Sequence, residues 1–533
     1  MRRALVALVA GLAAAVAGCG HGADLLAEAT LSTRLAIHVT DGAGGPPLGA
    51  RVLLFGPNDT PLEIGEVDLF GTRQGEAACV LAAGAIGTIA GIVVAPAGAE
   101  IRIGSDHCVP TPAIPFGVYR VWAWHGIDHE RWEGVVDLSP GRGRVALTIP
   151  LERAWAPHGA LAADLHVHAA ASDDSVMPNT QRVLAQVAAG IQVVALSNHN
   201  VADSAAPAIH ALGLEGTIAA LPSIELTAMR AHVGIYPVLL ARQVDGDAIR
   251  DMEPDAVLAL ARTFADDPII QLNHPRFRVT AMYDYEAWDG VAWPPPFPLT
   301  YNAVEVINGF TAFDAPDDRR IEEGVRDLYT LVDHGHPIAA LGNSDTHDYN
   351  WVADGAARSF VFVPAAAATT QPFDQAAFIA AIRARHTEAT TGPYLEVAAS
   401  PRAGGPAVGP GELVAAADDT VWLDITVSVA RFVVVDRVRI TIGGPAGPQL
   451  VETIPLVRGE RTSHWHGRIR VGHADTWIGV TADGDTPLPL EQTGTYQRDK
   501  WKRAGDTPFA VISPILVDAD GDGHWRRGDA PGL

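Results

Sequence analysis

Nine side chains with the chemistry of metal ligands recur along the middle of this 533-residue chain. Zinc, manganese and iron all bind imidazole nitrogen and carboxylate oxygen, so the ligand types alone suit any of the three. Clustered ions lower the pKa of a bound water and stabilise a developing oxyanion, which is the chemistry of hydrolysis. The sequence therefore predicts a site for two or three divalent ions. Its expected ligands are His166, His168, Asp173, His199, Glu225, His232, His274, Asp345 and His347.

Two pairs of these candidates are separated by a single residue. His166 and His168 fall at the end of an apolar run, and side chains two apart on a strand leave the same face. Asp345 and His347 have the same spacing after another apolar run. Asp174 directly follows Asp173 and competes with it for the same role. Each residue taken singly could be structural, whereas the set in this order favours a metal site.

Apolar strands alternate with helical segments from residue 158 to residue 394. The expected strands are Leu161–Val167, Val193–Ser197, Ile218–Ile224, Ile269–Asn273, Ala303–Ile307 and Ile338–Leu341. The expected helices are Asn179–Ala189, Asp255–Ala265, Asp317–Asp333 and Phe373–Ala384. Repeated β–α units imply a parallel sheet or barrel, where functional residues lie at the carboxyl ends of strands. Most candidate ligands end or follow an expected strand, so the pattern of elements supports the proposed site.

The segments on either side have the pattern of β structure. Apolar and polar residues alternate around Leu35, Ile37 and Val39, and again from Val421 to Val429. This alternation, broken by frequent turns, is typical of β-sandwiches. The expected domains are an N-terminal β-sandwich at 35–157, similar at Gly117–Val121 to carboxypeptidase-regulatory-like modules, the α/β segment at 158–394, a linker rich in Gly, Ala and Pro at 395–418, and a C-terminal β domain at 419–533.

The N-terminus has the pattern of a bacterial export signal. Arg2 and Arg3 precede an apolar run too short to span a bilayer comfortably. The run ends at Val16–Cys19, which resembles a lipobox in which Cys19 becomes lipidated. We expect residues 1–19 to be a lipoprotein signal peptide and 20–34 a tether. The exported protein would then be anchored by lipid on the periplasmic side of a membrane or at the cell surface. An ordinary signal peptide cut nearby is the alternative.

Two further features would stabilise the folded chain. Cys79 and Cys108 are the remaining cysteines, and in an exported domain they favour a disulfide over two separate buried thiols. Near the C-terminus, aspartates alternate with small residues as in the first half of a calcium-binding loop. The expected calcium ligands are Asp518, Asp520, Asp522 and Asp529. The alternative is an acidic turn that closes the last strand.

The formal net charge is −24, from 38 Lys and Arg against 62 Asp and Glu. Such a surface repels nucleic acid and anionic membranes, so a small-molecule substrate is expected and membrane contact would occur only through the lipid. Lysine occurs only at Lys500 and Lys502. An anionic substrate would therefore have to be bound by Arg, His or metal.

As a set, the motifs resemble those of the PHP (polymerase and histidinol phosphatase) superfamily. They are DLHVH, SDD, LSNHN, SIEL, HVGIYP, NHPR, VEVINGF, GNSDTHD and TTGP. The last three, with the flanking β modules, are most similar to the carbaryl-hydrolase-like (CehA/McbA type) branch. The resemblance covers 158–394 and implies a multi-domain α/β protein: a central distorted (β/α)7 barrel flanked by N-terminal and C-terminal β-sandwich-like domains. The chain departs from the family at Asn198, where an aspartate is usual.

The resemblance also implies how the ligands are divided among the ions. The first ion would be bound by His166, His168, Glu225 and Asp345, the second by Glu225, His232 and His274, and the third by Asp173, His199 and His347. Glu225 would bridge the first two ions. The ligand types do not decide whether the third position is filled.

The expected reaction is metal-dependent hydrolysis of a phosphoester by an activated water. Glu225 would act at the reacting centre, and Arg276 would contact an anionic substrate with its forked guanidinium or else form a surface salt bridge. His386 and Asn308 are candidates for contact with the metal ligands or with the substrate. One alternative is hydrolysis of a carbamate, ester or amide, which aromatic residues from 283–313 would favour. Another is a non-catalytic surface lipoprotein that binds a partner.

Overall fold

The computed structural model describes residues 33–56, 85–88, 91–103, 114–276, 280–309, 320–347, 353–444, 446–489 and 507–527. Within these ranges the chain is a strand-rich α/β protein with five sheets. The expected signal peptide and tether lie outside the described residues, apart from the last two tether positions, as do Cys19, Cys79, Cys108 and Asp529. Across the part of the chain described, no helix combines the length and the apolar character needed to cross a membrane.

The N-terminal part consists of two sheets that enclose one apolar core. Their strands are β1 (Thr33–Asp41), β2 (Ala50–Phe55), β3 (Ala85–Thr88), β4 (Gly91–Val94), β5 (Ala99–Ile103), β6 (Val118–Trp124), β7 (Trp132–Asp137) and β8 (Gly143–Leu151). One sheet has the order β5-β1-β8 and the other β3-β4-β2-β6-β7. Leu35, Ile37 and Val39 of β1 are buried against Val52 and Val121 of the second sheet. The alternation in β1 therefore places its apolar side chains between the sheets.

The central part supplies the strands that carry the candidate ligands. They are β9 (Ala160–Val167), β10 (Val193–Leu196), β11 (Ala219–Leu221), β12 (Ile224–Ala228), β13 (Ala231–Tyr236), β14 (Ile269–Leu272), β15 (Ala303–Asn308), β16 (Ala339–Asn343), β17 (Arg358–Phe362) and β18 (Thr387–Thr390). Strands β12-β13-β14-β15-β16 form one sheet, and β11-β10-β9-β17-β18 lie in another. The pairs β9–β10, β14–β15 and β15–β16 are parallel, but β12–β13 and β13–β14 are antiparallel. The sheets are therefore mixed rather than wholly parallel.

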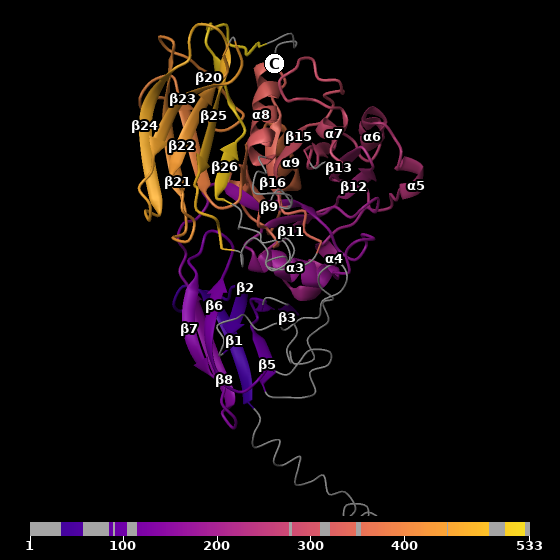
Figure 1. Ribbon diagram of the computed structural model, residues 1–533, viewed down its shortest axis with the longest axis vertical. Helices are drawn as coiled ribbons and strands as arrows, with labels where there is room; N and C mark the ends of the chain where they lie inside the picture. The colour runs from indigo at the N-terminus through magenta and orange to yellow at the C-terminus, as the bar shows by residue number, and fades with distance from the viewer. Residues whose placement is uncertain are drawn as a thin grey trace, which may run out of the picture.

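Helices connect and cover these strands (Figure 1). They are α3 (Asn179–Ala188), α4 (Ala206–Leu212), α5 (Gly246–Ile249), α6 (Pro254–Ala261), α7 (Met282–Tyr285), α8 (Arg320–Asp333) and α9 (Gln375–Arg383). Helix α9 begins at a side-chain cap, because Asp374 accepts a hydrogen bond of 2.9 Å from the backbone N–H of Ala377. The four helices expected from the sequence correspond to α3, α6, α8 and α9.

Two isolated parallel bridges connect the two central sheets. Val167 pairs with Thr346, and His199 pairs with Glu225. The backbone N–H of His168 donates to the carbonyl of Thr346 at 3.0 Å, which reinforces the first bridge. The carboxyl ends of β9, β10 and β16 and the start of β12 therefore meet where the candidate ligands lie. Among the described residues, these single bridges, rather than continuous strand pairing, connect the two sheets.

The C-terminal part is all β and shares a sheet with the central part. Its strands are β19 (Tyr394–Ser400), β20 (Leu413–Ala415), β21 (Thr420–Ser428), β22 (Arg437–Ile442), β23 (Gln449–Pro455), β24 (Thr462–Arg470), β25 (Thr476–Asp483), β26 (Phe509–Ile512) and β27 (Ile515–Asp518). β18 pairs with β26, so the large sheet continues from β9 to β23. The expected linker at 395–418 contains most of β19 and all of β20, since Leu395, Val397 and Ala399 are buried against β21.

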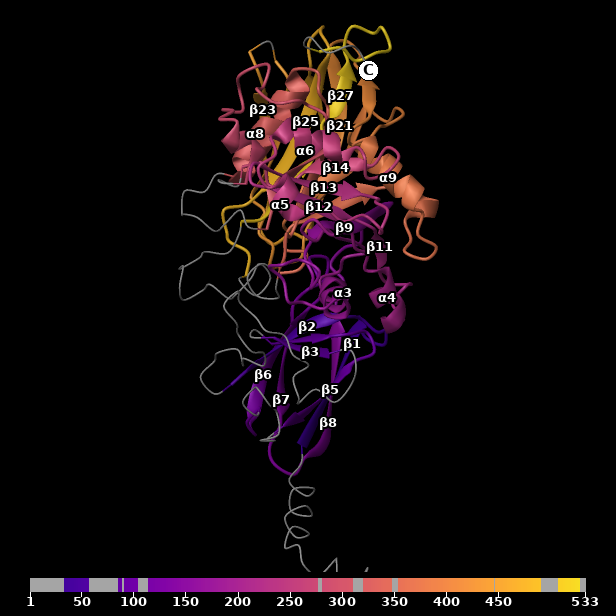
Figure 2. The same cartoon turned by 90° about the vertical axis from the view of Figure 1, so that its right-hand side faces the viewer.

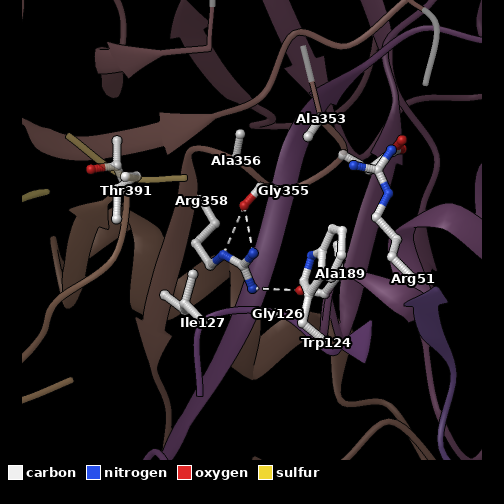
Figure 3. Close-up of a pocket in the computed structure, with 12 residues that line it drawn as sticks. Arg51, Trp124, Gly126, Ile127, Ala189, Ala353, Gly355, Ala356, Arg358 and Thr391 are labelled. Atoms are coloured by element: carbon white, nitrogen blue, oxygen red, sulfur yellow. Dashed lines mark hydrogen bonds between the residues drawn. The ribbon is translucent and has the colours of Figure 1, made fainter. Parts of the chain in front are cut away.

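The three parts are arranged along one long axis. The N-terminal sheets occupy one end, and the central and C-terminal parts share the other, with the C-terminal sheets beside α8 (Figures 1 and 2). Figure 3 shows the junction, where β17 contributes Arg358. Its guanidinium donates to the carbonyl of Ala189 at the C-cap of α3 at 2.8 Å and, through Nε, to that of Gly355 at 2.9 Å. The cavity beside it, lined also by Arg51 and Trp124, measures about 20 Å³, enough for about one water. This junction is a packed interface.

Candidate metal centre

The end of β9 delivers two histidines to the centre of the cluster. His166 and His168 are fully buried, and their Nε2 atoms lie 3.1 Å and 3.2 Å from Oδ1 of Asp345. Nε2 of His166 also lies 3.0 Å from Oε1 of Glu225. The two-residue spacing therefore directs both imidazoles toward the same carboxylates, as a strand requires.

Glu225 on β12 is the central carboxylate of the cluster. Its side chain is fully buried, and Asn273 donates a hydrogen bond of 2.7 Å to Oε1. Burial alone would raise the pKa of Glu225, but the surrounding imidazoles hold it well below its ordinary value. The nearest imidazole nitrogens and their distances from its oxygens are His199 Nδ1 at 2.7 Å, His166 Nε2 at 3.0 Å, His232 Nδ1 at 3.3 Å, His274 Nε2 at 3.7 Å and His168 Nε2 at 3.9 Å. Histidines from four parts of the fold thus converge on one carboxylate.

A third carboxylate, that of Asp174, lies on the outer side of the cluster. Its Oδ2 lies 3.0 Å from Nε2 of His199 and 3.0 Å from Nε2 of His347. Asp173, the residue that we assigned to this position, is exposed and is in none of the candidate ligand groups named below. The two aspartates occupy one turn, whose geometry turns the second inward. The other eight expected ligands lie together.

The cluster is closed on one side and accessible on the other. His166, His168 and Glu225 have no exposed side-chain surface, whereas Asp174 is 39% exposed. His199 and His347 are 14% and 15% exposed. A substrate would therefore approach from the side of Asp174, while the buried ligands exclude water from the opposite side.

Nitrogen and oxygen atoms of the cluster are placed as metal ligands require. His168 Nε2 and His232 Nδ1 are buried and make no hydrogen bond within the described structure, although carboxylate oxygens lie 3.2 Å and 3.3 Å away. Buried polar atoms without such bonds are costly, and a cation between nitrogen and oxygen removes that cost. Four overlapping groups have all their ligand atoms within 4.8 Å of one another. They are His168–Asp174–His199–His347, His166–His274–Asp345, His166–His168–Glu225 and His199–Glu225–His232. These residues fit a polynuclear site for divalent metals.

His199 shows how strongly this arrangement attracts positive charge. Its Nδ1 faces Glu225 at 2.7 Å and its Nε2 faces Asp174 at 3.0 Å. Burial would lower the pKa of His199, but the two carboxylates raise it to about 10. A ring placed between two carboxylates is stabilised as a cation, and a metal ion can supply the same positive charge.

Glu305 on β15 also lies in this region, although we did not predict it from the sequence. It is 2% exposed and lies 3.1 Å from Nδ1 of His166. The signal in the sequence was a single carboxylate inside an otherwise apolar strand, where an unpartnered charge would be costly. Asn308, which was expected to contact the metal ligands or the substrate, donates to Glu305 at 2.8 Å and to Oδ2 of Asp345 at 3.2 Å.

Arg276 forms salt bridges, which was the alternative to an anion contact. Its Nε and Nη2 donate to the two carboxylate oxygens of Asp327 at 2.6 Å and 2.9 Å, and its Nη1 donates to Asp284 at 3.2 Å. The side chain is 9% exposed. Since carboxylates already occupy the guanidinium fork, Arg276 is a structural cation. The nearby aromatic residues Tyr283 and Trp288 pack against each other in the core.

His386 lies at the far end of the sheet from the cluster. Its carbonyl accepts a hydrogen bond from Phe362, which pairs with Ala160 at the start of β9, whereas His166 and His168 lie at the other end of that strand. His386 instead lines a surface cavity of about 560 Å³ together with His158. The expected catalytic role of His386 therefore has no geometric support.

The acidic C-terminal loop forms a hydrogen-bonded turn. Asp518 accepts bonds of 2.8 Å and 3.0 Å from the backbone N–H groups of Gly521 and Gly523. Asp522 pairs with Arg526. The fourth expected ligand, Asp529, lies outside the described residues, so calcium binding stays a prediction.

No protein-family model matches the chain, and no curated protein matches it. Among solved structures, PsfC from Pseudomonas syringae PB-5123 is similar at 16% identity over 39% of this chain and 83% of that chain, with a TM-score of 0.26. An amidohydrolase from Chromobacterium violaceum, solved with bound sulfate and no metal, is similar at 15% identity over 35% and 87%, with a TM-score of 0.22. These similarities are distant.

Proposed function

We propose that this protein is a metal-dependent hydrolase of the PHP type, related to the carbaryl-hydrolase-like branch, that uses two or three divalent ions. The observation that carries the proposal is the position of Glu225, whose buried carboxylate has five imidazole nitrogens within 3.9 Å. A purely structural core rarely gathers so many ionisable groups, because each must be desolvated.

Bound metals would supply a water activated for attack and positive charge for the developing oxyanion. The residues of the chain bind and orient the ions, and the buried histidines of β9 close the inner side of the site. Glu225 faces histidines that belong to more than one ligand group, which is the position required of a bridging carboxylate. Asp174 lies at the accessible side, where it replaces Asp173 in the ligand set.

A distorted seven-stranded barrel is part of this proposal. Strands β12 to β16 form five neighbours in order, and β9 pairs with β10. The bridges Val167–Thr346 and His199–Glu225 connect the end of β9 with the residues after β16, and the residues after β10 with the start of β12, and would close a ring of seven. Both bridges involve residues of the cluster or their direct neighbours, which supports a barrel whose irregular points form the site.

The proposed substrate is a phosphoester, and a carbamate or ester is the second candidate. The second candidate is favoured by Arg276, because its guanidinium is occupied by Asp327 and Asp284 and does not offer an anion contact. In either case the substrate is a small molecule bound from the side of Asp174. Export as a lipoprotein through Cys19 is proposed from the sequence alone.

The function is tested by turnover of p-nitrophenyl phosphate and 1-naphthyl methylcarbamate by the purified chain supplied with zinc, manganese or iron. Glu225→Gln should abolish turnover of whichever compound is hydrolysed, while Glu388→Gln should leave it unchanged. Glu388 is a suitable control because it is also fully buried and accepts one bond of 3.0 Å from the backbone of Leu395, on β18 away from the cluster. Equal activity of Glu225→Gln and the unaltered protein would place catalysis elsewhere.

A further inference from the structure

Glu305 receives hydrogen bonds from four donors although it lies inside an apolar strand. Its neighbours Val304, Val306 and Ile307 are buried hydrophobic residues, and Glu305 itself is 2% exposed. The donors and their distances are His166 Nδ1 at 3.1 Å and Asn343 Nδ2 at 3.0 Å to Oε1, and the backbone N of His274 at 2.7 Å and Asn308 Nδ2 at 2.8 Å to Oε2.

This arrangement requires a carboxylate. Each oxygen accepts two hydrogen bonds, whereas a glutamine would direct its NH₂ group at two other donors. In the described structure none of these bonds comes from Lys or Arg, so the charge of Glu305 is not neutralised by a permanent cation. His166, and any cation bound beyond it, supply the compensating positive charge.

The bond to Glu305 determines which nitrogen of His166 faces the cluster. With the Nδ1–H group donated to Glu305, Nε2 points at Oε1 of Glu225 at 3.0 Å and Oδ1 of Asp345 at 3.1 Å. Asn273 Nδ2 also lies 3.3 Å from Nε2, where it can donate to the lone pair of that nitrogen. A carboxylate on the far nitrogen fixes the ring orientation and makes the near nitrogen a stronger ligand.

The second oxygen of Glu305, Oε2, orients the other two members of the same ligand group, His274 and Asp345. It binds the backbone N–H of His274, a residue with a positive φ of 25° that a side chain normally avoids. Through Asn308, which also donates to Oδ2 of Asp345 at 3.2 Å, it is linked to the third member. His166, His274 and Asp345 are one of the groups whose ligand atoms lie within 4.8 Å of one another.

We propose that Glu305 is the positioning residue that assembles the His166–His274–Asp345 ligand group and makes Nε2 of His166 its ligating nitrogen. The inference rests on the proposed metal-dependent function, because it concerns how that site is organised. Glu305 itself does not bind the metal. It acts through the three ligands, so its substitution should weaken metal binding while the fold is retained.

The test is metal titration of chelator-stripped protein by calorimetry, with zinc chloride and separately with manganese chloride. Glu305→Gln should bind at least one equivalent about 10- to 100-fold more weakly than the unaltered protein, the usual effect of losing such an outer carboxylate. Glu388→Gln, the matched buried glutamate, should bind with unchanged affinity. Urea unfolding of all three proteins separates a loss of affinity from a loss of structure. Equal affinity of Glu305→Gln and the unaltered protein overturns the inference.

A second measurement needs no variant and so does not depend on folding of a mutant. In a crystal structure of the metal-loaded protein, Nε2 of His166 should bind the metal and Nδ1 should remain within hydrogen-bond distance of Glu305. Ligation through Nδ1, or direct ligation by Glu305, overturns the inference. If the unaltered protein binds zinc, manganese and ferrous iron no better than an unrelated protein, the proposed function itself fails, which is a different outcome from unchanged affinity in the variant.

Discussion

Oε2 of Glu225 lies 2.7 Å from Nδ1 of His199, across the bridge that joins β12 to the residues after β10. The irregular points between the two central sheets are therefore also the points where ionisable side chains meet. Glu225 itself lies in the regular ladder between β12 and β13, opposite Gly234, so the site forms where this ladder meets the residues that follow β10.

The neighbouring aspartates 173 and 174 provide a matched pair of variants. Asp174→Asn should lower metal affinity and turnover by at least about 10-fold, because Oδ2 of Asp174 lies 3.0 Å from both His199 and His347. Asp173→Asn removes the same charge one residue away, from an exposed side chain. Its affinity and turnover should equal those of the unaltered protein. Equal losses in both variants would show that metal affinity and turnover depend on the net negative charge of this turn and not on the position of Asp174.

Arg276 is expected to contribute to stability. Arg276→Ala would leave Asp327, whose side chain is 1% exposed, without its bidentate partner, while Arg326 would remain 3.2 Å from Oδ1. Breaking a buried ion pair from one side costs about 3–5 kcal/mol, and because Arg326 offsets part of that cost, urea unfolding should show a loss near or below the lower end of this range. The double variant Arg276→Ala/Asp327→Ala should lose less than the sum of the single variants. A selective rise in KM for p-nitrophenyl phosphate, with stability unchanged, would restore the anion-contact role.

The sequence predicted the segments that carry the candidate ligands, but it did not distinguish between two adjacent residues of the same type. Apolar strands such as β10 and β14 end in His199 and His274 after one or two polar residues, and this pattern places them at a strand end. Asp173 and Asp174 are adjacent aspartates with the same side chain and almost the same sequence neighbours. Only the geometry of the turn, which depends on packing against other segments, distinguishes them.

The roles of residues outside the ligand set depended on contacts distant in sequence. Arg276 binds Asp327, which is 51 residues away, and no local pattern indicates that pairing. His386 precedes a strand that continues the sheet beside β9, so its distance from the cluster follows from strand order. The strand β19 lay in a segment that looked like a linker from its Gly and Pro content. Its own alternation of Leu395 and Val397 was the local signal for a strand.

His386→Ala should leave metal content and kcat/KM unchanged. The residue directly precedes β18 and pairs with Phe362 of β17, which in turn pairs with Ala160 at the beginning of β9, whereas the cluster lies at the other end of β9. It lines a surface cavity and its side chain is not needed for packing of the metal ligands. Steady-state kinetics with both test substrates check this. A large fall in kcat with retained metal would return His386 to the catalytic residues.

The protein should lose stability in acid through His125, which lies outside the cluster. Burial, with a smaller contribution from His129, lowers the pKa of His125 to about 4 from its ordinary value of 6.5. The unfolded chain therefore binds a proton at this site at a pH where the folded chain does not. The contribution of neutral His125 is complete above pH 6.5 and is lost as the pH falls toward 4, at a cost of about 3 kcal/mol.

Urea unfolding at several pH values checks this expectation. His125→Asn keeps a donor for the carbonyl of Gly49, which His125 Nδ1 contacts at 2.6 Å, but cannot titrate. Its free energy of unfolding should fall less steeply between pH 6.5 and pH 4 than that of the unaltered protein. Identical slopes in the two proteins would assign the acid sensitivity to other groups.

The most direct measurement is the metal content of the purified protein by elemental analysis, made together with turnover of the two test substrates. We expect two or three equivalents of zinc, manganese or iron in the unaltered protein. Glu225→Gln should retain fewer equivalents and lose turnover by at least about 100-fold, since even outer carboxylates contribute 10- to 100-fold. A protein that holds no divalent metal after reconstitution, or that hydrolyses substrate equally well without it, would contradict the metal centre.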